Sequence, residues 1–314
     1  MSTMLEDLAG PPVGYLLAFV WGALWGSFYN VAVVWGTGRR ASLVKPASHC
    51  LACGAPIKFY DNIPLVSYLV LRGRCRACGA RFSPRYLVIE ALGAGLSLLL
   101  YWRFVAGAAA DGSLAARLAQ FVVYEKFAGL LLVISAIDLE KLIIPDRITY
   151  PSIPVAMALS LLLPLPRWWD GLVGAVAGYG FVWLLAEVYY LIRRREGMGL
   201  GDAKLLAIIG AILGWRALPY VIFLASLQGS VIGLGGLLLG VRLSPPVPPE
   251  AGGAPDAAPA PGPGMPEAAP APAPADAPPL RFAAIPFGPF LALGALEFLF
   301  LAHLLRRYLG LYGL

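Results

Sequence analysis

The dominant pattern along the chain is a series of long apolar runs separated by shorter basic or proline-rich links. About 20 apolar residues are enough for a helix to cross the hydrocarbon layer of a membrane. We therefore expect an all-α polytopic integral membrane protein with about eight transmembrane helices. The expected helices are 13–35, 86–108, 118–137, 149–165, 169–192, 203–218, 219–241 and 284–305.

The composition supports the same class of protein. Hydrophobic residues make up 59% of the 314 residues and charged residues only 13%, a balance that an ordinary soluble domain does not have. The N-terminus Met-Ser-Thr-Met-Leu-Glu-Asp lacks the basic flank of a secretory signal. We therefore expect the first apolar run to be a retained helix and not a cleaved leader.

The distribution of charge predicts an orientation. Residues 36–85 hold nine Lys and Arg against one acid, Asp61, and loops rich in Lys and Arg stay on the cytoplasmic side. This loop should be cytoplasmic and the N-terminus periplasmic, which also places 138–148 and 193–204 inside. Basic loops beside an anionic inner leaflet account for the net charge of +6, so the charge is no argument for nucleic acid as a partner.

One segment has a composition of its own. Residues 245–279 contain fourteen of the 28 prolines and no Lys or Arg, so they cannot bury a core and should form a disordered or polyproline-II linker. This linker is either a spacer or a docking segment for a proline-binding partner. The expected domains are the first helix (1–35), the cytoplasmic loop (36–85), the transmembrane core (86–244), the linker (245–279) and the last helix with the C-terminus (280–314).

Four cysteines form two Cys-x-x-Cys pairs in the basic loop. The pairs are Cys50 with Cys53 and Cys75 with Cys78, and 21 residues separate them, close to the spacing of a zinc ribbon. Thiolates on a reducing, cytoplasmic side stay available to a metal, so we expect a zinc knuckle; the alternative is two disulfides in a secreted loop. The glycine after each second cysteine eases the turn around a metal. His49 is expected to be a solvated loop residue beside this site; the alternative is that it replaces a cysteine as a zinc ligand.

Two aspartates are the candidates for catalysis. Asp138 lies at the inner end of the third expected helix, and Asp202 lies at the inner start of the sixth, in Gly199-Leu200-Gly201-Asp202. Charges at membrane depth are costly and usually functional, and both residues should lie at the same depth near the cytoplasmic face. Two facing carboxylates share a proton, so that one acts as general base and the other as general acid. The alternative for Asp202 is a helix N-cap beside flexible glycines, including Gly197.

Other ionisable groups have plainer expected roles. Asp146 follows Pro145 at a helix start and should be a cap or a supporting group beside the reacting pair. Isolated acids in or beside spans should make packing or interhelical hydrogen-bond contacts; these are Glu90, Glu125, Glu187 and Glu297. His303 has no partner pattern.

Taken together, the motifs resemble those of the bifunctional prepilin peptidases, or type IV leader peptidases. The resemblance covers almost the whole chain, and its specificity lies in the order and spacing of the motifs. They are Gly26-Ser27-Phe28-Tyr29-Asn30-Val31, the two cysteine pairs with Tyr60-Asp61-Asn62-Ile63-Pro64 and Leu71-Arg72-Gly73-Arg74-Cys75 between them, Ile137-Asp138, Pro145-Asp146, Gly199-Leu200-Gly201-Asp202 and Ile285-Pro286-Phe287-Gly288-Pro289-Phe290. The segment from Val33 to Arg40 and the proline-rich insert depart from the family.

The resemblance implies a peptidase of the bacterial cytoplasmic membrane. Such enzymes cut the leader from prepilins and pseudopilins of type IV pili and type II secretion, and the family's catalytic aspartates correspond to Asp138 and Asp202. Many members also methylate the new N-terminus with S-adenosylmethionine, which is implied here by resemblance alone. Three alternatives remain from the residues: a proton-coupled transporter with paired carboxylates, a presenilin-like protease, and a non-enzymatic assembly platform.

Overall fold

The computed structural model describes residues 6, 9–38, 42–44, 48–50, 52–107, 112–164, 168–194, 199–239 and 286–309. Over these residues the chain is helical and forms no strand beyond two isolated bridges. The α-helices are α2 (Val13–Gly36), α3 (Val66–Val70), α4 (Arg85–Tyr101), α5 (Leu114–Lys141), α6 (Asp146–Ser160), α7 (Trp168–Arg193), α8 (Gly201–Leu213), α9 (Leu218–Leu238) and α10 (Gly288–Leu309).

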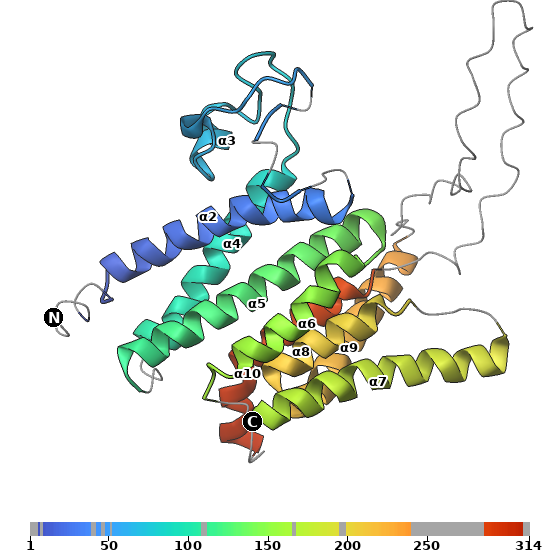
Figure 1. The fold of residues 1–314 in the computed structure, drawn as a ribbon. Coiled ribbons are helices and arrows are strands. Elements are labelled where there is room, and N and C mark those ends of the chain that lie inside the picture. Colours follow the sequence, from blue (N-terminus) through green and yellow to red (C-terminus); the bar gives the residue numbers. More distant parts are fainter. Residues whose placement is uncertain are drawn as a thin grey trace, which may run out of the picture. The chain divides into compact units, whose positions relative to one another are not determined.

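The chain divides into two units. The first comprises 1–228 and 286–314 and holds the core; the second, 229–285, is described only over 229–239, which complete helix α9. Within the first unit, α2, α4 and α5 pack together, and α8 packs with α6, α7 and α10 (Figure 1). Helix α10 also packs on α5, which joins the two groups of helices.

Each of the eight expected helices is present, and the all-α fold is confirmed. Among the described residues, four helices are long and apolar enough to cross a membrane: Val13–Gly36, Arg85–Ala106, Trp169–Arg193 and Trp215–Gly236. Helix Gly288–Ala302 is a shorter apolar helix. Helix α6 contains Pro151 and Pro154, and α8 has only 13 residues. The number of spans therefore stays a prediction. The expected linker 245–279 lies outside the described residues.

Small residues allow the helices to approach closely. A Cβ at Gly26 would lie 2.7 Å from the Glu90 Cα, and one at Gly93 would lie 2.9 Å from the Gly22 carbonyl oxygen. Helices α7 and α8 meet in the same way, through the backbones of Gly174 and Gly210. Packing of this kind stabilises helix pairs in lipid, where the hydrophobic effect between helices is absent.

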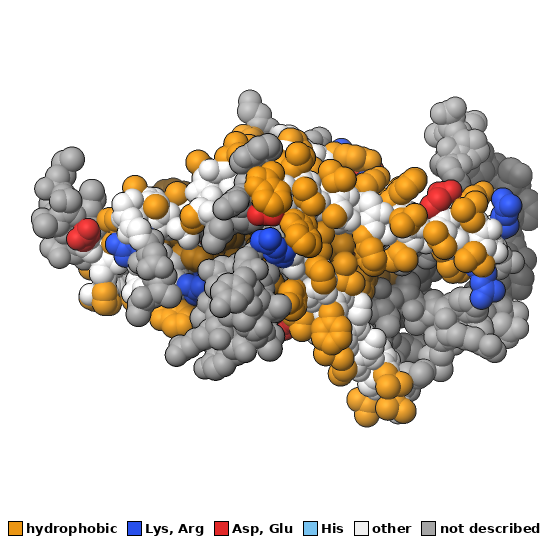
Figure 2. Space-filling model, turned by 90° about the horizontal axis from the view of Figure 1, so that it is seen from below, with side chains coloured by type: hydrophobic (Ala, Val, Ile, Leu, Met, Phe, Trp, Pro, Cys, Tyr) orange, Lys and Arg blue, Asp and Glu red, His pale blue; other side chains and the backbone are white. Residues whose placement is uncertain are grey.

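The outer surface is apolar. Figure 2 shows one face covered mainly by hydrophobic side chains, with only scattered charges. On α7, Val176, Leu184 and Ile192 are among many large apolar side chains that are exposed. A surface with so many exposed large apolar side chains fits lipid better than water.

Polar side chains in the helices bind one another, as expected for interhelical acids. The Tyr29 hydroxyl on α2 donates to Glu125 Oε1 on α5 at 3.0 Å, and Gln228 Nε2 donates to Glu297 Oε2 at 2.6 Å. Asn30 Nδ2 donates to the Tyr86 carbonyl at 3.1 Å and ties α2 to the start of α4. Glu187 is exposed on α7, and this acid shows no such role.

Candidate active site and metal centre

The two cysteine pairs fold into two copies of one turn. The Cys50 N–H donates to the Ala55 carbonyl at 2.9 Å, and the Cys75 N–H donates to the Ala80 carbonyl at 2.8 Å. Gly54 and Gly79 have φ angles of +71° and +72°, in the left-handed region that glycine adopts at least cost. The sequence repeat Cys-x-Ala-Cys-Gly-Ala therefore sets the local geometry of both halves.

The turns bring the four sulfurs together. The Sγ atoms of Cys50, Cys53, Cys75 and Cys78 all lie within 4.8 Å of one another, and none of the four cysteines is in a disulfide. Cys50 Sγ and Cys78 Sγ are 3.8 Å apart, the edge of a tetrahedron whose metal–sulfur distance is about 2.3 Å. The four residues fit a tetrahedral zinc ion. The two-disulfide alternative is not supported.

Backbone groups prepare one of these thiols to bind a metal. The N–H groups of Cys53 and Ala52 point at the Cys50 sulfur and lower the pKa of this thiol to about 6. A thiolate, not a thiol, is the form that binds a metal. His49 pairs with Pro56 in a backbone bridge, and the cluster of four ligands forms without it.

Charged side chains hold this module in shape and attach it to the helices. Arg76 binds Asp61 through three hydrogen bonds of 2.6–3.0 Å and holds the pKa of that carboxyl below its usual value. Arg85, at the start of α4, forms an ion pair with Glu140 near the end of α5. The Glu90 carboxylate accepts the Leu65 N–H at 2.7 Å and also hydrogen-bonds the Ser27 side chain of α2, so this acid anchors a loop as well as a neighbouring helix.

Asp138 lies buried in the last turn of α5. Its Oδ2 accepts a hydrogen bond of 3.0 Å from the N–H of Gly288, the first residue of α10 and 150 positions away in sequence. Hydrogen bonding to the ionised form of a carboxylate favours that form, as does the positive end of a helix. The start of α10 therefore stabilises negative charge on Asp138.

Asp202 is the second residue of α8 and interacts electrostatically with Asp138. The N-cap position belongs to Leu200, and no side chain caps the helix, so the N-cap interpretation of Asp202 is wrong. Helices α6 and α10 each pack against both α5 and α8. The two aspartates therefore lie near one junction, where α5 ends and where α8 and α10 begin.

At this junction Gly201 and Gly288 both pack closely against Ile144. A Cβ at Gly201 would lie 2.9 Å from Ile144 Cβ, and one at Gly288 would lie 2.7 Å from Asp138 Oδ2 and 3.3 Å from Ile144 Cδ1. Neither glycine has a positive φ, so both serve close packing more than backbone freedom. Nothing lies within 4 Å of a Cβ at Gly199, and Gly197 lies outside the described residues.

Asp146 pairs with a lysine that sequence reasoning missed. The N-cap of α6 is Pro145, and the Asp146 carboxylate forms an ion pair with the buried Lys204 of α8. Lys204 also lies over the Tyr150 ring, 4.5 Å from its centroid. The pair ties α6 to α8 two residues beyond Asp202. A lone lysine at the start of an apolar helix, next to the Gly-x-Gly-Asp motif, was the available signal.

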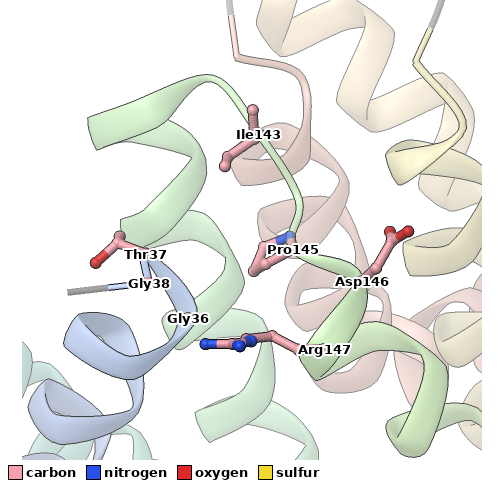
Figure 3. Close-up of a pocket in the computed structure, with 7 residues that line it drawn as sticks. All are labelled: Gly36, Thr37, Gly38, Ile143, Pro145, Asp146 and Arg147. Carbon is pink, nitrogen blue, oxygen red and sulfur yellow. The ribbon is translucent and has the colours of Figure 1, made fainter. Parts of the chain in front are cut away.

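A cavity of about 610 Å³ adjoins this region (Figure 3). It lies between the end of α2 and the connection from α5 to α6. Arg147 donates to the Trp35 carbonyl at 3.2 Å and lies over that indole ring, which links α2 to α6. The lining residues are Gly36, Thr37, Gly38, Ile143, Pro145, Asp146 and Arg147.

Comparison with known proteins identifies relatives of this chain. The family described as "Bacterial Peptidase A24 N-terminal domain" matches residues 20–104, and the "Type IV leader peptidase family" matches residues 126–234. Proteins named "Prepilin leader peptidase/N-methyltransferase" are similar over most of their length. The one from Aeromonas salmonicida strain A449 is 37% identical over 76% of this chain and 87% of its own.

Two further relatives carry the same name. The Pseudomonas putida protein is 36% identical over 76% of this chain and 86% of its own, and the Klebsiella pneumoniae protein is 34% identical over 71% and 99%. No solved structure matches the chain. The two family matches together include the cysteine module, within residues 20–104, and both aspartates, within residues 126–234.

Proposed function

The chain belongs to the type IV leader peptidase family, and from this premise we propose that it is a membrane aspartic endopeptidase. Its substrates would be type IV prepilins and type II secretion pseudopilins, from which it removes the leader. The observation that carries the proposal is the convergence of Asp138 and Asp202 from α5 and α8, with the Gly288 N–H on Asp138. The reaction would occur at the cytoplasmic face of the bacterial inner membrane, with the N-terminus periplasmic.

The surroundings of the two carboxylates suggest different roles. Asp138 accepts the Gly288 N–H and is the better stabilised anion, so it is the general base. Asp202 interacts electrostatically with this negative charge, and double ionisation of two interacting carboxylates is costly, so it is the protonated general acid. Both belong to helix ends, where water from the cytoplasm reaches them without crossing the bilayer centre.

In this scheme the protons balance through the pair. Asp138 takes a proton from water as the water oxygen attacks the scissile carbonyl carbon, and Asp202 gives its proton to the carbonyl oxygen. The tetrahedral intermediate then collapses, the C–N bond breaks, and Asp138 returns its proton to the leaving amine. Asp202 recovers a proton from the intermediate's hydroxyl. No covalent enzyme intermediate is formed.

The cysteine module would hold one zinc ion in a structural role. Four thiolates, from Cys50, Cys53, Cys75 and Cys78, leave no open coordination position for water. When bound, the zinc would fix the two turns relative to each other and supply no catalytic group.

N-methylation of the new N-terminus is a second activity that the relatives' name suggests. The group supplied by S-adenosylmethionine would be a methyl cation equivalent. The described residues form no β-strand and so lack the strand–glycine turn–helix unit of nucleotide-binding folds.

The test is cleavage of synthetic prepilins by purified protein, with the products sequenced by mass spectrometry. We expect a single cut after the glycine that precedes the apolar helix, unchanged by a zinc chelator during the assay. A glycine→valine substrate should be cut poorly, because a side chain there would clash with the approaching aspartates, whereas changing the number of basic leader residues should matter less. Cleavage that stops with chelation, or efficient cutting of the valine substrate, would contradict the proposed site.

A further inference from the structure

The short helix α3 of the cysteine module turns polar groups inward and apolar groups outward. Ser67 is buried, and its hydroxyl donates to the Tyr60 carbonyl at 3.1 Å and accepts the Ile63 N–H at 3.0 Å. On the outer side, Val66, Leu69 and Val70 are 52%, 65% and 70% exposed. A module surrounded by water buries such residues and exposes serine. The outer face of α3 is therefore built for an apolar neighbour.

The fold holds α3 beside the first turns of a membrane helix. Leu65, directly before α3, has a φ of +63° and donates its N–H to Glu90 of α4 at 2.7 Å. Helix α4 belongs to a segment long and apolar enough to cross a membrane. Glu90 is five residues beyond the helix start at Arg85, or about 8 Å along the axis. Interfacial helices bury their apolar face about 5–10 Å into the boundary between headgroups and acyl chains.

The positive charge of the module also favours contact with the membrane surface. Its one acid in 36–85, Asp61, is paired with Arg76, so the remaining charge is positive. Arg72 and Arg74 follow α3 directly and are exposed. Basic residues beside an apolar face bind anionic lipid headgroups.

We propose that the outer face of α3, formed by Val66, Leu69 and Val70, docks together with the exposed Ile63 that precedes the helix on the anionic cytoplasmic leaflet of the membrane. The apolar side chains enter the boundary between headgroups and acyl chains, and Arg72 and Arg74 contact the headgroups. The zinc module then lies against the membrane beside α2 and α4 instead of standing free in the cytoplasm. This inference rests on the membrane location of the chain and not on its proteolytic activity.

The test is photo-crosslinking of the full chain in nanodiscs that contain phosphatidylglycerol. A benzoylphenylalanine replaces Leu69 in one variant and Ala77, which is exposed on the second cysteine turn, in a matched control. We expect lipid adducts at position 69 with a yield at least about fivefold above that at position 77. A metal content of one zinc per chain verifies that each module is folded, and Val70 replaces Leu69 as the labelled position if that variant loses zinc.

Three outcomes would overturn the docking surface. They are equal lipid yields at the two positions, a dominant crosslink to a second copy of the chain, and a dominant crosslink to an added prepilin. Cleavage of prepilin by the same samples is measured separately, so loss of lipid contact and loss of proteolysis are distinguishable.

Discussion

The cysteine module and the aspartate site are assembled in opposite ways. The module is built from two nearby copies of one short sequence, and each turn is closed by hydrogen bonds spanning five residues, such as Cys50 to Ala55. The aspartate site depends on contacts between residues far apart in sequence, such as Asp138 with Gly288. A metal can therefore stabilise the module locally, whereas the catalytic pair depends on the packing of several helices.

This difference predicts where changes do most damage. Substitutions at the helix junction around Ile144 should displace reacting groups even when the protein still folds. Substitutions in the module should remove metal and local order while the junction remains intact.

Gly288 should be the most sensitive position outside the aspartates. Gly288→Ala places a Cβ about 2.7 Å from Asp138 Oδ2, and misplacement of a catalytic group by about 1 Å lowers the rate about 100-fold. Gly288→Pro removes the N–H as well, at a first helical position that tolerates proline, and should be slower still. The measurement is kcat for prepilin cleavage by both variants.

Gly180→Ala on α7 is the matched control for these glycine changes. Nothing lies within 4 Å of a Cβ at Gly180, so this variant should retain full activity and accumulation. Near-normal cleavage by Gly288→Ala would show that Asp138 does not need the close approach of α10.

The ion pair between Asp146 and Lys204 should have an intermediate effect. Asp146→Asn leaves the buried Lys204 without its carboxylate partner, and we expect a rate reduction of about fivefold, equivalent to about 1 kcal/mol. Lys204→Met should be milder, because it removes the buried charge itself. The comparison of kcat for the two variants checks this order; a larger loss in Lys204→Met would instead indicate a direct role for the lysine.

Loss of the metal should affect cleavage least. Cys78→Ser should abolish stoichiometric zinc, measured by elemental analysis, because four thiolates are needed to close the site. Leader removal should fall by no more than about threefold, since the module supplies no reacting group. Absence of zinc from the wild-type protein would contradict the metal site. Loss of cleavage in a Cys78→Ser protein that accumulates normally would show that the aspartate site depends on the module.

Much of the fold could be predicted from sequence because lipid imposes a simple pattern. Long apolar runs marked each of the eight expected helices, and the doubled Cys-x-x-Cys motif marked the four-cysteine cluster, since its geometry is local. Helix ends were less predictable: α5 extends to Lys141, beyond the expected end at 137, because Asp138 is buried by α10 and not by lipid. Helix α3 and its outward apolar face were not predicted, because five residues are too few to show a helical repeat of apolar positions.

The aspartates were identified, but their surroundings were not. The contact between Gly288 and Asp138 spans 150 residues, and no periodicity in one sequence reports such a pairing. The ion pair between Lys204 and Asp146 could not be predicted either, because the two residues lie at the starts of different helices, 58 residues apart in sequence. The sequence also allowed Asp202 to be the N-cap of its helix. The structure excludes this role, because Leu200 occupies the N-cap position.

The most direct measurement is leader removal by isosteric variants of the two aspartates in native membranes. Asp138→Asn and Asp202→Asn should each nearly abolish cleavage, because one remaining carboxylate cannot act as both acid and base. Asp170→Asn is the matched control, since Asp170 is also buried and an asparagine oxygen can still accept the hydrogen bond from Trp215 Nε1. The account predicts cleavage only in wild type and Asp170→Asn at equal protein levels; full cleavage by Asp138→Asn or Asp202→Asn would contradict it.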